Sequence, residues 1–107
     1  MPELNETIHQ PIRLRIMASL VTLAADEEMD FTTLRKLLEV TDGNLGAHLR
    51  KLEEAGYISV DKTFVERKPR TYIAATTAGR KVFSQHVAAL ELIINSKRGK
   101  HETDHSG

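Results

Sequence analysis

The chain has 107 residues, of which 40% are hydrophobic and 28% are charged, and it contains no cysteine. This length allows one folded domain with a modest core. The lack of cysteine excludes disulfide bridges, thiolate metal ligands and a cysteine nucleophile. No apolar run approaches the roughly 20 residues that span a bilayer, and residues 1–10 lack the features of a secretory signal. We therefore expect a cytoplasmic protein without a membrane partner.

The formal net charge is zero, but the charges are unevenly distributed along the chain. Residues 1–40 carry four Lys and Arg against seven Asp and Glu, whereas residues 41–75 carry six against five and residues 76–107 carry five against three. A surface that contacts phosphate groups must therefore be a local patch in the middle of the chain.

Two helices are expected in the N-terminal part of the chain. Pro11 suits the first position of a helix, because its missing N–H costs nothing there. Apolar residues recur behind it at helical spacing, and they are Ile12, Ile16, Leu20, Leu23 and Ala24. A polar loop over residues 25–29 leads to Asp30, which is a good N-cap for a second helix of about nine residues.

A third helix is expected from Asp42 to Ala55. Thr41 can cap its start, Asp42 places a negative charge in its first turn, and Gly56 stands where helices commonly end. The apolar residues at i, i+4 and i+7 define its inward face, and they are Leu45, Leu49 and Leu52.

After the third helix the pattern changes to that of β-strands. Residues 57–65 predict one strand, residues 66–70 a turn, and residues 71–74 the returning strand. A hairpin directly after a third helix is typical of a winged helix.

A long final helix completes the predicted fold, which is mainly α with a small β-hairpin. This helix is expected from Thr77 to about Arg98. Residues 1–98 thus form one winged helix-turn-helix domain with long N- and C-terminal helices, and residues 99–107 form a disordered polar tail.

The outward face of the third helix is small and polar, which suits a major groove about 12 Å wide. Asn44 can bond an adenine edge, and Arg50 or Lys51 can reach guanine or phosphate. The candidate DNA contacts of this helix are Thr41, Gly43, Asn44, Ala47, His48, Arg50 and Lys51. The alternative is a solvated face, because Arg50 has Glu54 four residues further on.

Two residues of this helix have two interpretations each. His48 lies about 60° from the centre of the apolar face, so it is either a half-buried spacer or a phosphate contact. Gly46 costs the helix roughly 1 kcal/mol against alanine. A glycine there makes sense where the backbone comes close to DNA or to another helix.

The hairpin carries the second basic cluster of the chain. Arg67, Lys68 and Arg70 lie within four residues of one another, Lys62 precedes them, and Pro69 stiffens the loop. A basic hairpin tip beside a helix that fits the major groove is typical of backbone or minor-groove binding. Charged hairpin turns also occur on ordinary protein surfaces.

Six stretches of the sequence closely resemble the MarR/ArsR-like winged-helix transcriptional regulators. They are residues 11–16 (PIRLRI), 31–38 (FTTLRKLL), 41–45 (TDGNL), 48–58 (HLRKLEEAGYI), 68–71 (KPRT) and 77–80 (TAGR). The resemblance covers roughly residues 8–95. It implies a dimeric regulator on operator DNA, with the third helix in the major groove and the hairpin as wing. Position 46 is often a serine that bonds a phosphate in these regulators, and Gly46 cannot make that contact.

The last helix also predicts a homodimer. Its dimer seam, with spacings of four, three and four, consists of Phe83, Val87, Leu90 and Ile94. At 1.5 Å per residue this helix is about 33 Å long, more than the small core can cover. Two-fold symmetry would place two recognition helices about 34–36 Å apart. Alternatively, its first half packs on the N-terminal helix and the rest frays.

No metal or cofactor is expected. His86, His101 and His105 have spacings unlike a familiar sensor site, and cysteine is absent. His86 is expected to be a satisfied residue at the dimer seam. A small-molecule effector, whose identity the sequence does not give, would have to sit between the dimer helices and the core.

Two function classes fit the sequence. The first is a sequence-specific DNA-binding transcriptional regulator, favoured by the basic wing. The second is a winged-helix protein–protein interaction module, favoured by the zero net charge and by Glu53 and Glu54. An enzyme is not expected, because there is no recognisable nucleophile motif or glycine-rich phosphate loop.

Overall fold

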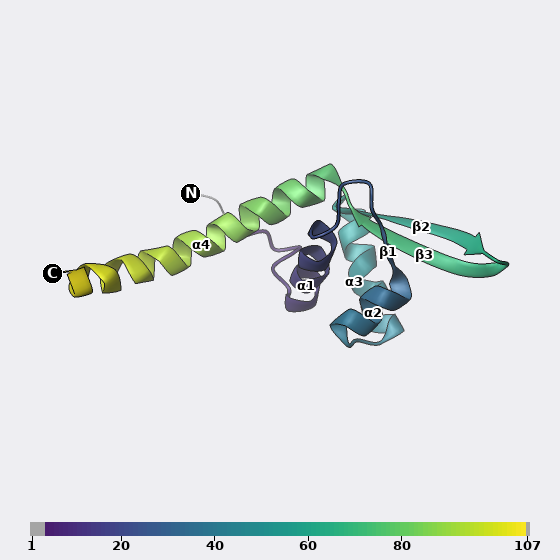
Figure 1. The fold of residues 1–107 in the computed structure, drawn as a ribbon, viewed down its shortest axis with the longest axis horizontal. Coiled ribbons are helices and arrows are strands. Elements are labelled where there is room, and N and C mark those ends of the chain that lie inside the picture. Colours follow the sequence, from purple (N-terminus) through teal and green to yellow (C-terminus); the bar gives the residue numbers. More distant parts are fainter. Residues whose placement is uncertain (1–3, 107) are drawn as a thin grey trace.

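A computed structural model describes residues 4–106 of the chain. Over these residues the chain forms four helices and three strands (Figure 1). In chain order they are α1 (Pro11–Val21), β1 (Met29–Asp30), α2 (Phe31–Leu38), α3 (Asp42–Glu54), β2 (Ile58–Val65), β3 (Lys68–Ala75) and α4 (Thr77–Ser106). The prediction of a mainly helical winged-helix fold is confirmed.

The helix starts follow from their capping residues. The Asp30 carboxylate accepts a hydrogen bond from the Thr33 backbone N–H at 3.3 Å, and the Thr41 hydroxyl accepts one from the Asn44 N–H at 3.1 Å. Each bond satisfies a donor that has no partner inside its helix. The predicted caps of α2 and α3 are therefore confirmed.

The two outer helices differ from their predicted lengths. α1 has 11 residues and ends at Val21, so it is shorter than the long helix that we expected. The Arg80 guanidinium on α4 donates to the backbone carbonyls of Leu23 and Ala24, at 2.9 and 3.2 Å. These bonds hold the chain after α1 in a loop. α4 has 30 residues and extends to Ser106, beyond the predicted end near Arg98.

The described strands form one antiparallel sheet in the order β1-β3-β2. β1 is a strand where the sequence predicted loop, and its Met29 pairs with Ile73 of β3. A strand of two residues is too short to show an alternating pattern in the sequence. It forms because it pairs with a strand far along the chain. The small hairpin of the prediction is thus the larger part of a three-stranded sheet.

The turn of the hairpin is shorter than predicted. It consists of Glu66 and Arg67, both in the left-handed region with φ of 51° and 68°. Two residues with positive φ form the tight turn that matches the twist of paired strands. The expected turn over residues 66–70 is therefore wrong, because Lys68 and Pro69 pair with Val65 and Phe64 as part of β3.

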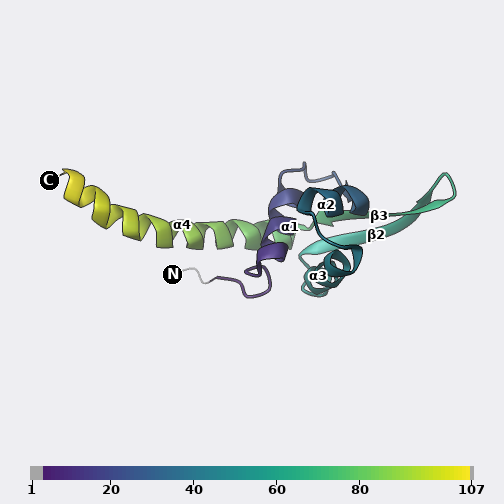
Figure 2. The same cartoon turned by 90° about the horizontal axis from the view of Figure 1, so that it is seen from below.

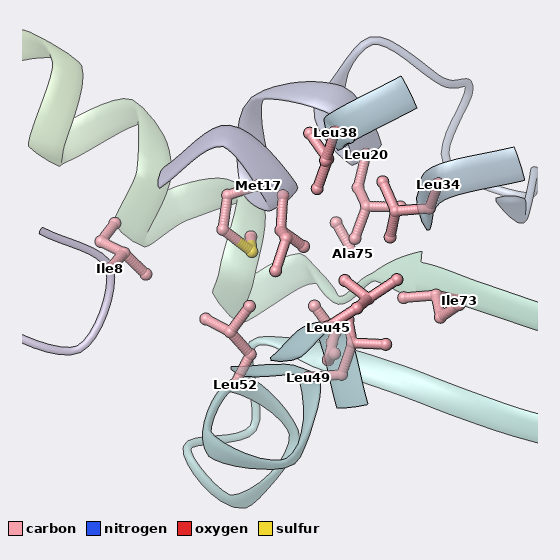
Figure 3. Close-up of a cluster of buried hydrophobic side chains, with 12 residues drawn as sticks. Ile8, Met17, Leu20, Leu34, Leu38, Leu45, Leu49, Leu52, Ile73 and Ala75 are labelled. Atoms are coloured by element: carbon pink, nitrogen blue, oxygen red, sulfur yellow. The ribbon is translucent and has the colours of Figure 1, made fainter. Parts of the chain in front are cut away.

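The core collects apolar side chains from α1, α2, α3 and the sheet (Figure 3). Leu45, Leu49 and Leu52 are at most 4% exposed, so the predicted inward face of α3 is confirmed. Ile8, which precedes α1, is also fully buried. At Gly79 the first turn of α4 packs closely against the backbone of Tyr57, the residue just before β2. A Cβ at this position would collide with the Tyr57 carbonyl, so the close contact requires glycine.

Residues 4–10 pack against α4 through a buried histidine. The Asn5 backbone N–H donates to Nδ1 of His86 at 3.3 Å, and Nε2 of His86 lies 3.3 Å from Nδ1 of His9. His86 is 1% exposed. The prediction that His86 is a satisfied residue is confirmed, and its partners belong to the N-terminal segment of the same chain.

The molecule is elongated, with extents of 67 × 25 × 23 Å. The hairpin and α4 extend to opposite sides of the body formed by α1, α2 and α3, as both views show (Figures 1 and 2). Within the described residues no helix is long and apolar enough to cross a membrane.

Candidate nucleic-acid interface

The outward face of α3 is available to a ligand. Thr41, Gly43, Asn44, Ala47, Arg50 and Lys51 are all exposed. These are the candidate contacts that the sequence placed on this face, apart from His48. The side chains near the N-terminal end are small, which leaves the backbone of the helix accessible.

His48 is half-buried on the flank of α3. Burial, and then the positive charge of Arg13, lower the pKa of His48 below its usual value. Both effects favour the neutral form of the imidazole over the charged form. This environment supports the interpretation of His48 as a half-buried spacer.

The acidic start of α3 is neutralised within the chain. Asp42 forms an ion pair with Arg35 of α2, with an N–O distance of 2.8 Å. The pair ties the two helices of the helix-turn-helix together. It also reduces the repulsion that the Asp42 carboxylate would exert on an approaching phosphate.

A hollow of about 320 Å³ separates α3 from the wing, which is the hairpin of β2 and β3. It is lined by Phe31, Gly46, Leu49, Arg50, Glu53, Val60, Lys62 and Thr71. The basic residues Arg50 of α3 and Lys62 of β2 therefore line the same hollow, although they belong to separate elements. Within the described part of the chain no ion pair joins Arg50 to Glu54.

The two faces of the wing carry different residues. Side chains alternate across a strand, and the pairing of Ile58 with Ala75 sets which residues share a face. The inner face, which continues the core side of the sheet, consists of Ile58, Val60, Lys62, Phe64, Pro69, Thr71, Ile73 and Ala75. The outer face consists of Ser59, Asp61, Thr63, Val65, Lys68, Arg70, Tyr72 and Ala74.

The predicted basic cluster of the wing is therefore divided. Lys62 lies on the inner face towards α3, Arg67 lies in the turn, and Lys68 and Arg70 lie on the outer face. Arg70 is also 3.7 Å from the Asp30 carboxylate, which already caps α2. Sequence spacing could not separate these residues, because the length of the turn decides the face of each one.

Gly46 lines the hollow, and a Cβ there would meet no atom of the chain within 4 Å. No neighbouring helix of the described chain therefore requires a glycine at this position. The sequence suggested two reasons for a glycine here, close approach to DNA or to another helix. Close approach to a helix within the chain is excluded.

The predicted dimer seam lies on one side of α4. Phe83, Val87 and Leu90 are half-buried, and Ile94 is 52% exposed. Phe83 and Val87 also line a second hollow of about 480 Å³, together with Val21, Arg80, Ser84, Ala88 and Glu91. The structure thus keeps an apolar surface open along this side.

Metal ligands do not gather in the described residues, where no group of three or more His, Cys, Asp or Glu could hold an ion. The side chains of His101 and His105 lie outside the part that the structure describes.

The chain is similar to known regulators in sequence and in fold. The family model of the winged helix DNA-binding domain matches residues 12–94. An uncharacterised protein of Methanocaldococcus jannaschii is 37% identical over 76 residues, which cover 71% of this chain and 79% of that protein. The transcriptional regulator homologue from Pyrococcus horikoshii OT3 has a TM-score of 0.78 at 29% identity, over 86% of this chain and 88% of that one.

A regulator of the MarR family from Enterococcus faecalis V583 shares the fold, with a TM-score of 0.65 at 21% identity over 92% of this chain and 84% of that one. The sequence-based interpretation as a winged helix-turn-helix regulator is thus confirmed. The family and the fold are those of transcriptional regulators, which are not enzymes. The chain belongs to the winged helix DNA-binding domain family.

Proposed function

We propose that this DNA-binding regulator acts as a homodimer on operator DNA, with α3 in the major groove and the wing on the adjoining backbone and minor groove. The observation that carries the proposal is the exposed face of α3 beside a hollow shared by Arg50 and Lys62. Because its target is DNA, we expect the protein to act in the cytoplasm.

The roles of the α3 residues follow from their exposure and chemistry. Asn44 offers an amide that can make two hydrogen bonds to an adenine edge, whereas Arg50 can reach guanine or phosphate. Gly43 and Ala47 are exposed and small, so they let the helix approach the bases. Asn44 therefore carries sequence preference, and the basic groups carry affinity.

The wing contributes positive charge at two places. Lys62 faces the hollow beside α3, and Arg67 lies in the turn at the tip. Lys68 and Arg70 lie on the other face, and Arg70 is near the Asp30 carboxylate. We therefore assign more of the phosphate binding to Lys62 and Arg67 than to Lys68 and Arg70.

A second copy of the chain is proposed to bind along α4. Towards the far part of this helix the seam residue Ile94 is 52% exposed, and Ile93 beside it is 44% exposed. Exposed apolar stripes usually mark contact surfaces. The hollow lined by Phe83 and Val87 lies between α4 and the end of α1, where a small effector would fit.

Measuring the affinity for duplex DNA against salt concentration tests the proposal. DNA sites are first selected from random sequence with the purified protein. A log–log slope of several units is expected, because each phosphate contact releases counterions. If the protein binds no DNA at low salt, the proposed function is wrong and a protein-interaction role becomes the better explanation.

Substitutions separate the two kinds of contact. Lys62→Ala with Arg67→Ala should weaken binding to all sequences alike and reduce the salt slope by about two, one for each phosphate contact. Asn44→Ala should instead change the preferred sequence. Lys68→Ala is the matched control on the outer face, and it should change affinity less than Lys62→Ala does. Equal losses from Lys62→Ala and Lys68→Ala would contradict the division of the wing into two faces.

A further inference from the structure

A large apolar side chain, Phe64, lies near the tip of the wing beside the basic turn residue Arg67 and its neighbour Lys68. Phe64 is 74% exposed, more than any other exposed large hydrophobic residue in the described part of the chain. It precedes Val65 and the two-residue turn of Glu66 and Arg67. A single exposed apolar residue is ordinary, so its position on the wing decides whether it has a role.

Phe64 lies on the face of the wing that is turned towards α3. The same face carries Val60 and Lys62, which line the hollow beside the helix. Val65 comes next in the chain, but its side chain lies on the outer face. Phe64 is therefore on the surface that DNA would meet if α3 enters the major groove.

The backbone around Phe64 is held in one geometry. Phe64 pairs across the hairpin with Pro69, whose ring fixes its own φ. The turn that follows is a tight two-residue turn with positive φ at both positions. A stiff hairpin loses little conformational entropy when its tip enters a groove.

The reach of the wing agrees with the spacing of DNA grooves. Val60 lies beside α3, and Phe64 is four residues further along β2, which is about 13 Å at 3.3 Å per residue. The minor groove next to an occupied major groove lies half a helical turn away, or about 17 Å. The position of Phe64 along β2 therefore accounts for most of this separation.

We propose that Phe64 is an apolar wedge that enters the minor groove and partly unstacks one base step. The proposal rests on the proposed DNA-binding function. Lys62 and Arg67 precede and follow Phe64 along the hairpin, so phosphates on both sides of the groove can be neutralised. Apolar wedges kink DNA most readily at flexible pyrimidine–purine steps. Phe64 therefore selects a deformable step about half a turn from the bases that α3 contacts.

The test uses a selected DNA site with 2-aminopurine at successive positions of the flanking minor groove. Unstacking of a labelled base raises its fluorescence. Binding of the parent protein should raise the signal at one step, and Phe64→Ala should abolish this rise and weaken binding about tenfold. The salt slope should stay unchanged, because no phosphate contact is lost. Phe64→Leu should retain most of the signal.

Val65→Ala is the matched control, since Val65 is the adjacent apolar residue on the other face. It should change neither the fluorescence nor the affinity. Thermal unfolding of each variant shows that the fold is intact.

Three results would overturn the wedge. They are equal effects of Phe64→Ala and Val65→Ala, a change of the salt slope with Phe64→Ala, and a loss of self-association in place of a loss of fluorescence. If the parent protein itself lacks salt-dependent DNA binding, the proposed function fails instead, so the two failures can be distinguished.

Discussion

Two glycines have opposite effects on the stability of this fold. A Cβ at Gly79 would collide with the backbone carbonyl of Tyr57, whereas a Cβ at Gly46 would meet nothing within 4 Å. The packing of α4 against the residue before β2 therefore requires a glycine at position 79. Gly46 carries the helix cost of glycine without a packing benefit inside the chain.

Alanine substitutions should separate these glycines. Gly79→Ala should lower the free energy of unfolding by about 1–3 kcal/mol, because backbone must move to remove the collision. Gly46→Ala should raise it by up to about 1 kcal/mol, because alanine favours the helix. Urea denaturation measures both changes. A neutral Gly79→Ala would show that α4 can shift without cost, contrary to the packing described.

The buried His86 predicts a pH-dependent stability. Burial, and then the nearby His9, lower the pKa of His86 below 6.5. The unfolded chain thus takes up a proton at a higher pH than the folded chain, and stability falls as the pH drops below about 6.5. The Asn5 N–H also donates to Nδ1 of His86, a bond that a protonated ring cannot accept.

We expect the free energy of unfolding to be highest above about pH 7 and to fall towards pH 5.5. His86→Gln should flatten this fall, as measured by urea denaturation at each pH. His48→Gln is the companion variant, because the pKa of His48 is also lowered, and it should remove a separate part of the slope. A parent-like pH profile for His86→Gln would exclude His86 as the cause.

At the scale of elements, Asp30 joins α2 to the sheet. One of its carboxylate oxygens caps α2 through the Thr33 N–H, and the other lies 3.7 Å from Arg70 of β3. The cap satisfies a backbone donor, whereas the ion pair is partly exposed to solvent. We therefore expect the cap to contribute more to stability than the ion pair.

Two substitutions of Asp30 distinguish these contributions. Asp30→Ala removes both and should cost about 1 kcal/mol of unfolding free energy or slightly more. Asp30→Asn keeps an oxygen that can cap the helix, so it should cost less than half of that. Thermal or urea unfolding measures the difference. Equal losses for the two variants would assign the stabilisation to the Arg70 pair instead.

At the scale of the whole molecule, α4 extends away from the body (Figure 2). Its far part carries exposed apolar residues. Ile94, at 52% exposure, lies at the far end of the proposed dimer seam. Gln85 is exposed on the same helix, but it is two residues from Phe83 and therefore faces away from the seam. The two positions make a matched pair for the same substitution.

A charge at Ile94 should weaken the dimer. Ile94→Glu buries an unpaired carboxylate in the proposed interface, so we expect self-association to weaken at least tenfold. Gln85→Glu should leave it unchanged. Sedimentation velocity over a range of concentrations measures both. A parent protein that is monomeric throughout, or equal behaviour of the two variants, would contradict the seam.

Much of the helical framework was predictable from the sequence. The caps Asp30 and Thr41, the inward leucines of α3 and the face that suits DNA all follow from local rules of capping and helical period. These rules involve residues within a few positions of one another. The sequence by itself therefore determines the winged helix and identifies α3 as its candidate groove-binding helix.

Other features were decided by partners far apart in the chain. The pairing of Met29 with Ile73, the bonds from Arg80 to the loop after α1, and the contact of Asn5 with His86 have no local signal. The length of the hairpin turn also escaped prediction, and it assigns the wing residues to two faces. Only the tertiary structure brings Lys62 beside Arg50 and places Phe64 on the same face, because strand register fixes side-chain direction.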